Sequence, residues 1–201
     1  MIRTGIFGGS FNPIHNGHLT LARQLREKAE LDEVWLMVSP QNPLKQSSDL
    51  LEDGKRMEMA RLALENEPHI IASDYEMHLP KPSYTWNTLQ ALSKDYPNRE
   101  FVLLMGGDNW EFFYRWYHYE DILRNYQIVV YPRKTSQADW YDVTSQASHA
   151  CLSPYEVCVV KADLLDISST EIRARIKAGK GIKRMVPKAV AEMILKERLY
   201  A

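Results

Sequence analysis

Short apolar runs alternate along the chain with longer segments in which apolar residues recur at helical spacing. Apolar runs of about four to eight residues indicate buried strands, and they cover residues 1–7, 34–38, 69–72, 101–105, 128–131 and 157–160. The helical spacing is clear at Leu19, Ala22, Leu25 and Ala29, with charged residues between them. The same spacing predicts further helices over residues 53–64, 85–92, 120–124, 169–178 and 187–199.

This alternation of strand and helix predicts an α/β fold. We expect a Rossmann-like, open and mostly parallel sheet of about six strands, with helices on both faces, in a single domain over residues 1–201. In such sheets ligands bind beyond the carboxyl ends of the strands. Residues 134–154 are polar, and both a short helix and an extended loop remain open for them.

Composition and charge exclude several classes of partner. The chain has 25 Lys and Arg against 26 Asp and Glu, a net charge of -1, so no overall field attracts nucleic acid or an anionic membrane. The first 15 residues contain glycine, proline and histidine in place of the apolar run of a signal peptide, and a stretch of ~18 apolar residues is absent. We therefore expect a cytoplasmic protein whose phosphate chemistry, if any, uses locally placed charge.

The segment GIFGGSFNPIHNGHL carries the first candidate site. Gly8 and Gly9 follow a predicted strand, so backbone N–H groups can approach a phosphate without an intervening Cβ. His15 and His18 lie three residues apart at the start of a predicted helix, which Asn16 could cap, and can meet the same anion. The glycine spacing fits neither the dinucleotide fingerprint nor a Walker A loop. Either histidine alone would be explained as a cap or a surface residue.

The segment ISSTEIR carries the second candidate site. Ser168 and Glu171 have the spacing of a capping box, which by itself explains both residues. Alternatively, the hydroxyls of Ser168, Ser169 and Thr170 and the N–H groups of this helix start bind the β- and γ-phosphates of a nucleotide. Arg173 would then add a charge-assisted contact to the same oxygens.

With both motifs in view, the chain resembles the bacterial nicotinate-nucleotide adenylyltransferases of the HxGH nucleotidyltransferase superfamily over essentially its whole length. The resemblance rests on GGSFNPIHNGH, SYTWNTL, MGGDNW, the tryptophan of FYRWYHYEDIL, and ISSTEIR. It implies transfer of the adenylyl group of ATP to nicotinate mononucleotide, giving nicotinate adenine dinucleotide (NaAD) and pyrophosphate in NAD biosynthesis. The attack on the α-phosphate would be in line, without a covalent intermediate. Mg²⁺ would accompany ATP, with no metal ligand expected from protein side chains.

The resemblance also implies site residues. Catalysis is expected from His15, His18, Lys45 and Arg173. ATP contacts are expected from Gly8, Gly9, Ser10, Phe11, His15, His18, Asp108, Ser168, Ser169, Thr170 and Arg173. Contacts to nicotinate mononucleotide are expected from Ser10, Lys45, Thr85, Trp116 and Arg133.

The chemistry of these residue types suits the acceptor. The N–H groups around Thr85, at a helix start that Ser83 could cap, would face the ring carboxylate. Trp116 would stack on the cationic pyridine ring, with core packing as its other reading. Asp108 would accept hydrogen bonds from ribose hydroxyls, with metal ligation as the alternative. Many relatives have histidine where this chain has Leu44, which removes one polar contact.

Two alternatives remain open. Asn12 stands where phosphopantetheine and glycerol-phosphate enzymes usually carry aspartate, which favours the nicotinate branch. The acceptor could still be nicotinamide mononucleotide or phosphopantetheine. The chain could also be a nucleotide sensor without catalysis, although the presence of both histidines and Arg173 argues against this. A homo-oligomer is left open.

Overall fold

The computed structural model describes residues 1–40, 50–131 and 157–201. In this part of the chain six strands form one sheet in the order β3-β2-β1-β4-β5-β6, and every neighbouring pair is parallel. The strands are β1 (Ile2–Gly9), β2 (Glu33–Val38), β3 (Ile70–Ser73), β4 (Arg99–Gly106), β5 (Gln127–Tyr131) and β6 (Val157–Val159). The predicted parallel sheet of about six strands is therefore confirmed.

The predicted helices are present as well. They are α1 (Asn16–Lys28), α2 (Asp53–Ala63), α3 (Thr85–Asp95), α5 (Tyr119–Asn125), α7 (Ser169–Lys177) and α8 (Lys188–Glu197). Three short elements were not predicted, namely the 3₁₀ helices η1 (Tyr75–His78) and η2 (Phe113–Arg115) and the single-turn helix α4 (Gly107–Trp110). The last of these lies at the carboxyl end of β4 and contributes to the site.

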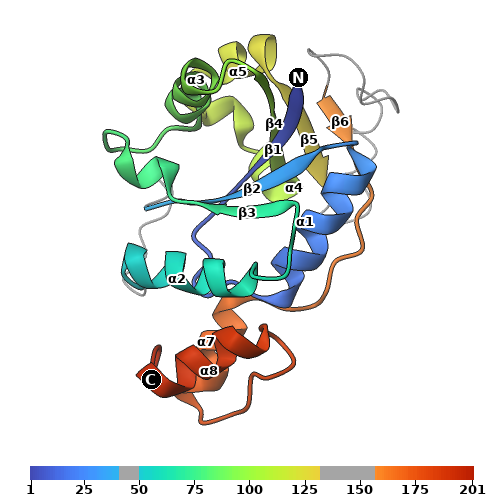
Figure 1. The fold of residues 1–201 in the computed structure, drawn as a ribbon. Coiled ribbons are helices and arrows are strands. Elements are labelled where there is room, and N and C mark those ends of the chain that lie inside the picture. The colour runs from blue at the N-terminus through green and yellow to red at the C-terminus, as the bar shows by residue number, and fades with distance from the viewer. Residues whose placement is uncertain (41–49, 132–156) are drawn as a thin grey trace.

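Helices cover both faces of the sheet, as predicted (Figure 1). Neighbouring strand residues point to opposite faces, so Phe7 and Leu36 pack with α1, α2 and α8, whereas Ile6 and Trp35 pack with α3 and α5. The core side chains on both faces are buried. A fully buried leucine such as Leu25 contributes about 1.5–3 kcal/mol relative to an exposed one. The fold thus rests on two apolar layers that hold the strands in fixed register.

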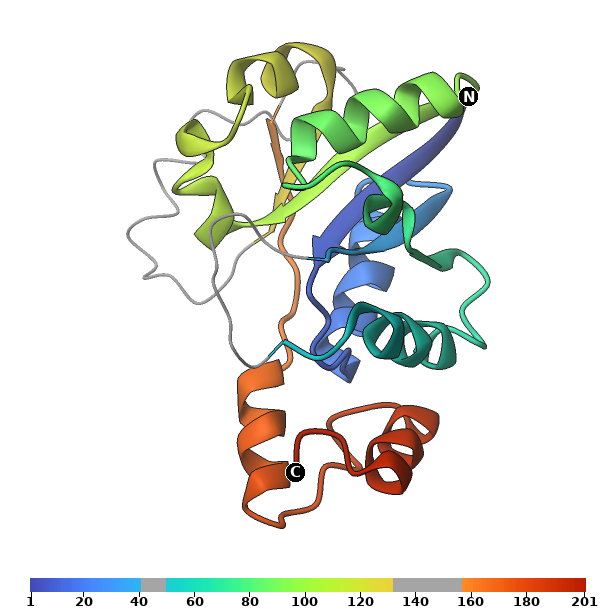
Figure 2. The same ribbon diagram turned by 90° about the vertical axis from the view of Figure 1, so that its left-hand side faces the viewer.

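After β6 the chain returns along the molecule to the carboxyl edge of the sheet, where α7 and α8 lie (Figures 1 and 2). Val190 and Ile194 of α8 belong to the same buried cluster as residues of α1, α2 and the strands. The C-terminal helices therefore share a core with the sheet. Among the described residues, none of the helices has the length and apolar character needed to cross a membrane.

The strand order fixes where a ligand can bind. The order reverses direction between β1 and β4, whose carboxyl ends lie at Gly9 and Gly106. The connections from these two strands leave toward opposite faces of the sheet, which opens a crevice between them. The first motif follows β1 directly, and MGGDNW spans the end of β4 and α4.

Candidate active site

His15 and His18 form a stacked pair at the start of α1. Their ring centroids lie 3.6 Å apart, with 24° between the ring planes. The His15 N–H donates to His18 Nδ1 at 3.2 Å, and the His18 N–H donates to the His15 backbone carbonyl at 2.9 Å. Since Nδ1 of His18 is an acceptor, the proton of the neutral ring lies on Nε2, which becomes a donor for an anion. The two histidines are brought together as predicted.

The cap of α1 differs from the prediction. His15 is the N-cap and Asn16 is the first helical residue. The Asn16 side chain does not cap the helix, and its amide donates to the carbonyl of Arg184 at 3.1 Å. Asn16 therefore attaches the start of α1 to the C-terminal part of the chain.

Close packing holds the histidine rings in place. A Cβ added at Gly17 would lie 3.0 Å from His15 Nδ1 and 3.1 Å from its Cε1, so a larger residue there would displace the ring. The Phe11 ring stands edge-on to His18, with centroids 5.0 Å apart. Phe11 as a whole is only 2% exposed, and its predicted contact with ATP stays a prediction. The glycine and the aromatic ring thus fix the orientation of both imidazoles.

The start of α7 is attached to the loop that connects β1 with α1. Ser168 is the N-cap and accepts from the Glu171 N–H at 3.1 Å, as the capping box predicted. The Ser169 hydroxyl donates to the carbonyl of Pro13 at 2.9 Å, and Arg173 Nη1 donates to the carbonyl of Asn12 at 2.7 Å. Two helix N-termini, each with a partial positive charge, therefore converge on the same loop.

A cavity of about 610 Å³ lies beyond the carboxyl ends of β1 and β4, a size typical of small-molecule sites. Its wall is formed by the end of β1 and by residues of α3, α4 and the segment around η2. Residues predicted to bind ligand that line it are Gly8, Gly9, Ser10, Thr85, Asp108 and Trp116.

The aromatic residues near the cavity divide into two groups. Phe113 is 3% exposed and belongs to the core, whereas Phe112, Trp116 and Tyr117 line the cavity. Trp116 lines the cavity and also packs against the core, so its stacking role stays a prediction. The predicted cap of α3 is wrong, because Tyr84 occupies the N-cap and Ser83 makes no capping bond. The Ser83 hydroxyl is buried in the cavity wall with no hydrogen-bond partner among the described residues.

Glu76 and Thr88 line the same cavity and were not predicted. The Thr88 hydroxyl donates to Glu76 Oε1 at 2.9 Å. Burial raises the pKa of the Glu76 carboxyl, while hydrogen bonds from Ser39 and Thr88 partly offset that rise. Glu76 lies in a single 3₁₀ turn, where no periodicity marks a buried acid.

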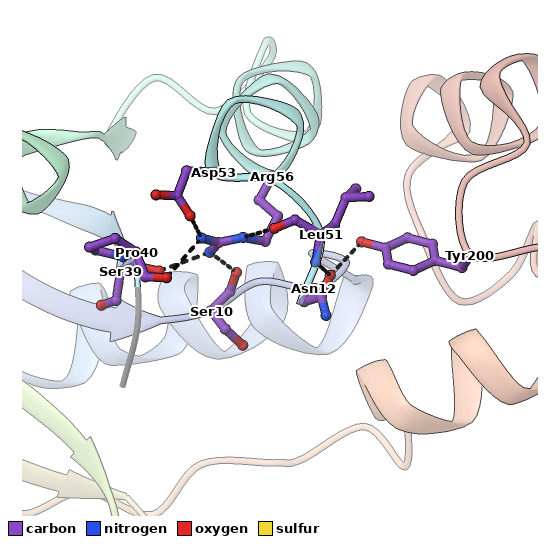
Figure 3. A network of polar contacts seen from close by, with 8 residues as sticks. All are labelled: Ser10, Asn12, Ser39, Pro40, Leu51, Asp53, Arg56 and Tyr200. Atoms are coloured by element: carbon purple, nitrogen blue, oxygen red, sulfur yellow. Dashed lines mark hydrogen bonds and ion pairs between the residues drawn. The ribbon is translucent and has the colours of Figure 1, made fainter. Parts of the chain in front are cut away.

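Arg56 was also missed, although it is fully buried (Figure 3). Its guanidinium donates to the carbonyls of Ser10 at 2.6 Å, Ser39 at 2.9 Å and Leu51 at 2.9 Å, and it pairs with Asp53. These bonds join the end of β1, the end of β2 and the segment before α2. One buried cation therefore holds together the backbone that borders the cavity.

Three positions named from the sequence lie outside the described residues. Lys45 and Leu44 fall in residues 41–49, and Arg133 falls in residues 132–156. Their predicted roles, and the reading of residues 134–154, stay predictions.

Comparison with known proteins agrees with this geometry. The family model described as cytidylyltransferase-like matches residues 6–175. A Bacteroides fragilis protein named "Probable nicotinate-nucleotide adenylyltransferase" is 45% identical over 195 residues, which are 97% of this chain and 92% of the relative. A Cytophaga hutchinsonii protein of the same name is 43% identical over 201 residues, 100% of this chain and 99% of the relative.

A solved structure has the same fold. The Plasmodium falciparum nicotinic acid mononucleotide adenylyltransferase complexed with NaAD superposes with a TM-score of 0.77 at 21% identity. The match covers 100% of this chain and 98% of that chain. At this level of identity the likeness concerns the arrangement of strands and helices.

Proposed function

Because the chain belongs to the cytidylyltransferase-like family and, within it, to the nicotinate-nucleotide adenylyltransferases, we propose that its site joins the adenylyl group of ATP to nicotinate mononucleotide. The products are nicotinate adenine dinucleotide and pyrophosphate, a step of NAD biosynthesis. The observation that carries this proposal is the convergence of the N-termini of α1 and α7 beside the cavity at the end of β1.

The ATP phosphates bind where the two helices begin. The stacked histidines present the His18 Nε2–H, and Arg173 adds a guanidinium held against the same loop. Gly8 and Gly9 let the backbone approach the phosphates closely, and the hydroxyls of Ser168 and Thr170 lie at the start of α7, while the Ser169 hydroxyl donates to Pro13. These donors are fixed before the reaction, so they stabilise negative charge as it develops on the phosphoryl oxygens.

The acceptor phosphate is the nucleophile. A phosphate monoester is already ionised near neutral pH, so no general base is required. One of its oxygens forms a bond to the α-phosphorus, the bond from that phosphorus to the β-bridging oxygen breaks, and pyrophosphate leaves with the electron pair. Catalysis consists of positioning and charge stabilisation, to which we assign His15, His18, Arg173 and, from the sequence, Lys45.

The nicotinate nucleotide occupies the cavity. Its ring stacks on Trp116, and its carboxylate faces the N–H groups at Thr85, the first residue of α3. Asp108, in the first turn of α4, accepts from ribose hydroxyls, and Ser10 borders the acceptor phosphate. Arg133 is assigned to the same carboxylate from the sequence alone.

Mg²⁺ belongs to the proposal as the ion bound to ATP. Within residues 1–40, 50–131 and 157–201, no group of three His, Cys, Asp or Glu side chains could hold a metal ion. The ATP phosphates would supply the ligands, and the bound ion would neutralise part of their charge. A cytoplasmic location follows from the same proposal, because ATP and pyridine nucleotides are consumed there.

An acceptor comparison tests this function. The purified protein is given ATP and Mg²⁺ with nicotinate mononucleotide, nicotinamide mononucleotide or phosphopantetheine, and pyrophosphate release is measured. We expect the fastest release with nicotinate mononucleotide, a dinucleotide of the corresponding mass, and loss of release when EDTA removes the Mg²⁺. Faster release with another acceptor would replace the proposed substrate. ATP binding without release for any acceptor would indicate a sensor.

A further inference from the structure

Asn12 connects three segments that are far apart in the sequence, and Figure 3 shows its contacts with two of them, at Leu51 and Tyr200. Its side-chain Oδ1 accepts from the Tyr200 hydroxyl at 2.8 Å and from the Leu51 N–H at 3.2 Å. Its backbone carbonyl accepts from Arg173 at 2.7 Å. Asn12 is only 3% exposed, so these bonds form away from bulk water, where losing one costs more than it would at the surface. The residue that anchors Arg173 is thus itself held by Tyr200.

The backbone after α8 is bent to bring Tyr200 to Asn12. Arg198 and Tyr200 have φ values of 53° and 63°, in the left-handed region that residues with a side chain seldom adopt. Such a conformation persists when surrounding contacts hold it, and it often accompanies a functional constraint. Here the phenol is half-buried, and its hydroxyl makes the bond to Asn12. The turn that ends α8 at its C-cap Arg198 is thus followed by a residue whose hydroxyl reaches Asn12.

The surroundings keep this hydroxyl a hydrogen-bond donor. Burial raises the pKa of the Tyr200 phenol, and the positive charges of Arg173 and Arg56 only partly oppose the rise. The phenol stays protonated at neutral pH, as an ordinary tyrosine does, and donates to Asn12 Oδ1. The guanidinium of Arg173 binds the backbone carbonyl of the same residue.

We infer that Tyr200 is a positioning residue for the ATP-phosphate site, which orients Asn12 and thereby holds Arg173 in place. The inference rests on the proposed function for the role of Arg173. An arginine side chain has many rotamers, and a bond to a fixed carbonyl removes most of that freedom before the phosphates arrive. Without the Tyr200 hydroxyl, Asn12 keeps the bond from Leu51 but loses the one on its C-terminal side. In that case the Arg173 side chain becomes ordered only when ATP binds, and this ordering weakens the binding of ATP.

The Tyr200→Phe variant tests this inference, with Tyr126→Phe as the matched control. Tyr126 is also buried, and its hydroxyl lies 3.0 Å from Ser93 Oγ, between α3 and the end of α5, outside the cavity lining. We expect Tyr200→Phe to raise the KM for ATP about tenfold, the scale of one lost buried hydrogen bond, with the KM for nicotinate mononucleotide unchanged. Tyr126→Phe should leave both KM values unchanged, even where it lowers the thermal midpoint.

A double-mutant cycle tests the route through Arg173. If Tyr200 acts on ATP by holding Arg173, the Tyr200→Phe effect on ATP disappears when Arg173 is already Gln. An equal rise in both KM values, or an undiminished effect in the Arg173→Gln background, would overturn the inference. Calorimetric titration of ATP into the parent, both single variants and the double variant measures the same coupling without turnover. The acceptor comparison on the parent protein separately decides the proposed function.

Discussion

His18 uses its two ring nitrogens for different purposes. Nδ1 accepts the His15 N–H and completes the start of α1, while Nε2 carries the proton and can face a phosphate. The edge-on Phe11 ring and the stacked His15 ring keep the imidazole in this orientation. The donor is therefore fixed by contacts that exist without ATP.

Replacing His18 by alanine should lower turnover by ~10²-fold or more, the usual effect of losing one preorganised donor. The measurement is pyrophosphate release at saturating ATP and nicotinate mononucleotide. His78→Ala is the control, because His78 is exposed near η1 and its side chain lies 3.8 Å from Asp74. Near-normal turnover in a folded His18→Ala protein would refute the assignment of His18.

At the scale of elements, the length of a helix or strand decides whether it can be predicted from the sequence. The predicted strands and helices are found because each contains a long enough apolar pattern. The missed elements η1, α4 and η2 have only four, four and three residues, too short for an apolar repeat to appear. The backbone conformation of these short elements is set by their packing against the sheet, and a local sequence pattern does not contain that information.

The helix that contains Arg56 was predicted, but the burial of the Arg56 side chain was not. In the sequence it is one charged residue among several in an amphipathic segment. In the structure α2 turns it inward, where the carbonyls ending β1 and β2 have no strand partner and need a donor. Arg56 therefore joins three elements, and removing it affects them together.

The Arg56→Met variant keeps a long side chain but leaves those buried carbonyls and Asp53 without their donor. We expect it to lower the free energy of unfolding by about 3–5 kcal/mol, the range for breaking a buried ionic network. Urea unfolding measures this, with Arg61→Met as the control, because Arg61 pairs with Asp74 at the surface. A surface pair contributes about 0–1 kcal/mol, so equal losses for the two variants would contradict the role of Arg56.

At the scale of the whole molecule, the site exists because topology brings distant segments together. The two motifs could each be identified from the sequence, and the order of strands and helices predicted the edge where they lie. The meeting of Asn12, Leu51 and Tyr200 could not be predicted, because it depends on the path of the chain after α8. The burial of Glu76 could not be predicted either, because its partners Thr88 and Ser39 come from α3 and from the end of β2.

The pKa of Glu76 links this burial to the stability of the molecule. Its pKa is raised on folding, so the folded protein binds the proton more tightly than the unfolded chain does. The resulting stability is fully present below the ordinary glutamate pKa and is lost as pH rises through the raised value. Glu76→Gln cannot ionise and keeps an oxygen for Thr88, so we expect it to escape this loss.

Urea unfolding of the parent and Glu76→Gln proteins at steps between about pH 4 and pH 8 checks this expectation. The stability of the variant relative to the parent should rise with pH. Glu65→Gln, at an exposed position on the same chain, should follow the parent. Parallel curves for the parent and Glu76→Gln would show that Glu76 does not contribute to the pH dependence.

The bond between Asn12 and Tyr200 spans 188 residues, and this has a consequence for a chain that is still being synthesised. Synthesis proceeds from the N-terminus, and domains fold as units as they emerge. All six described strands precede Tyr200, so the sheet can form around the acceptor cavity before that tyrosine has been added. A chain synthesised as far as β6 would then contain the residues that line the cavity but not α7 or Tyr200, so the contacts that meet at Asn12 would form later than the sheet.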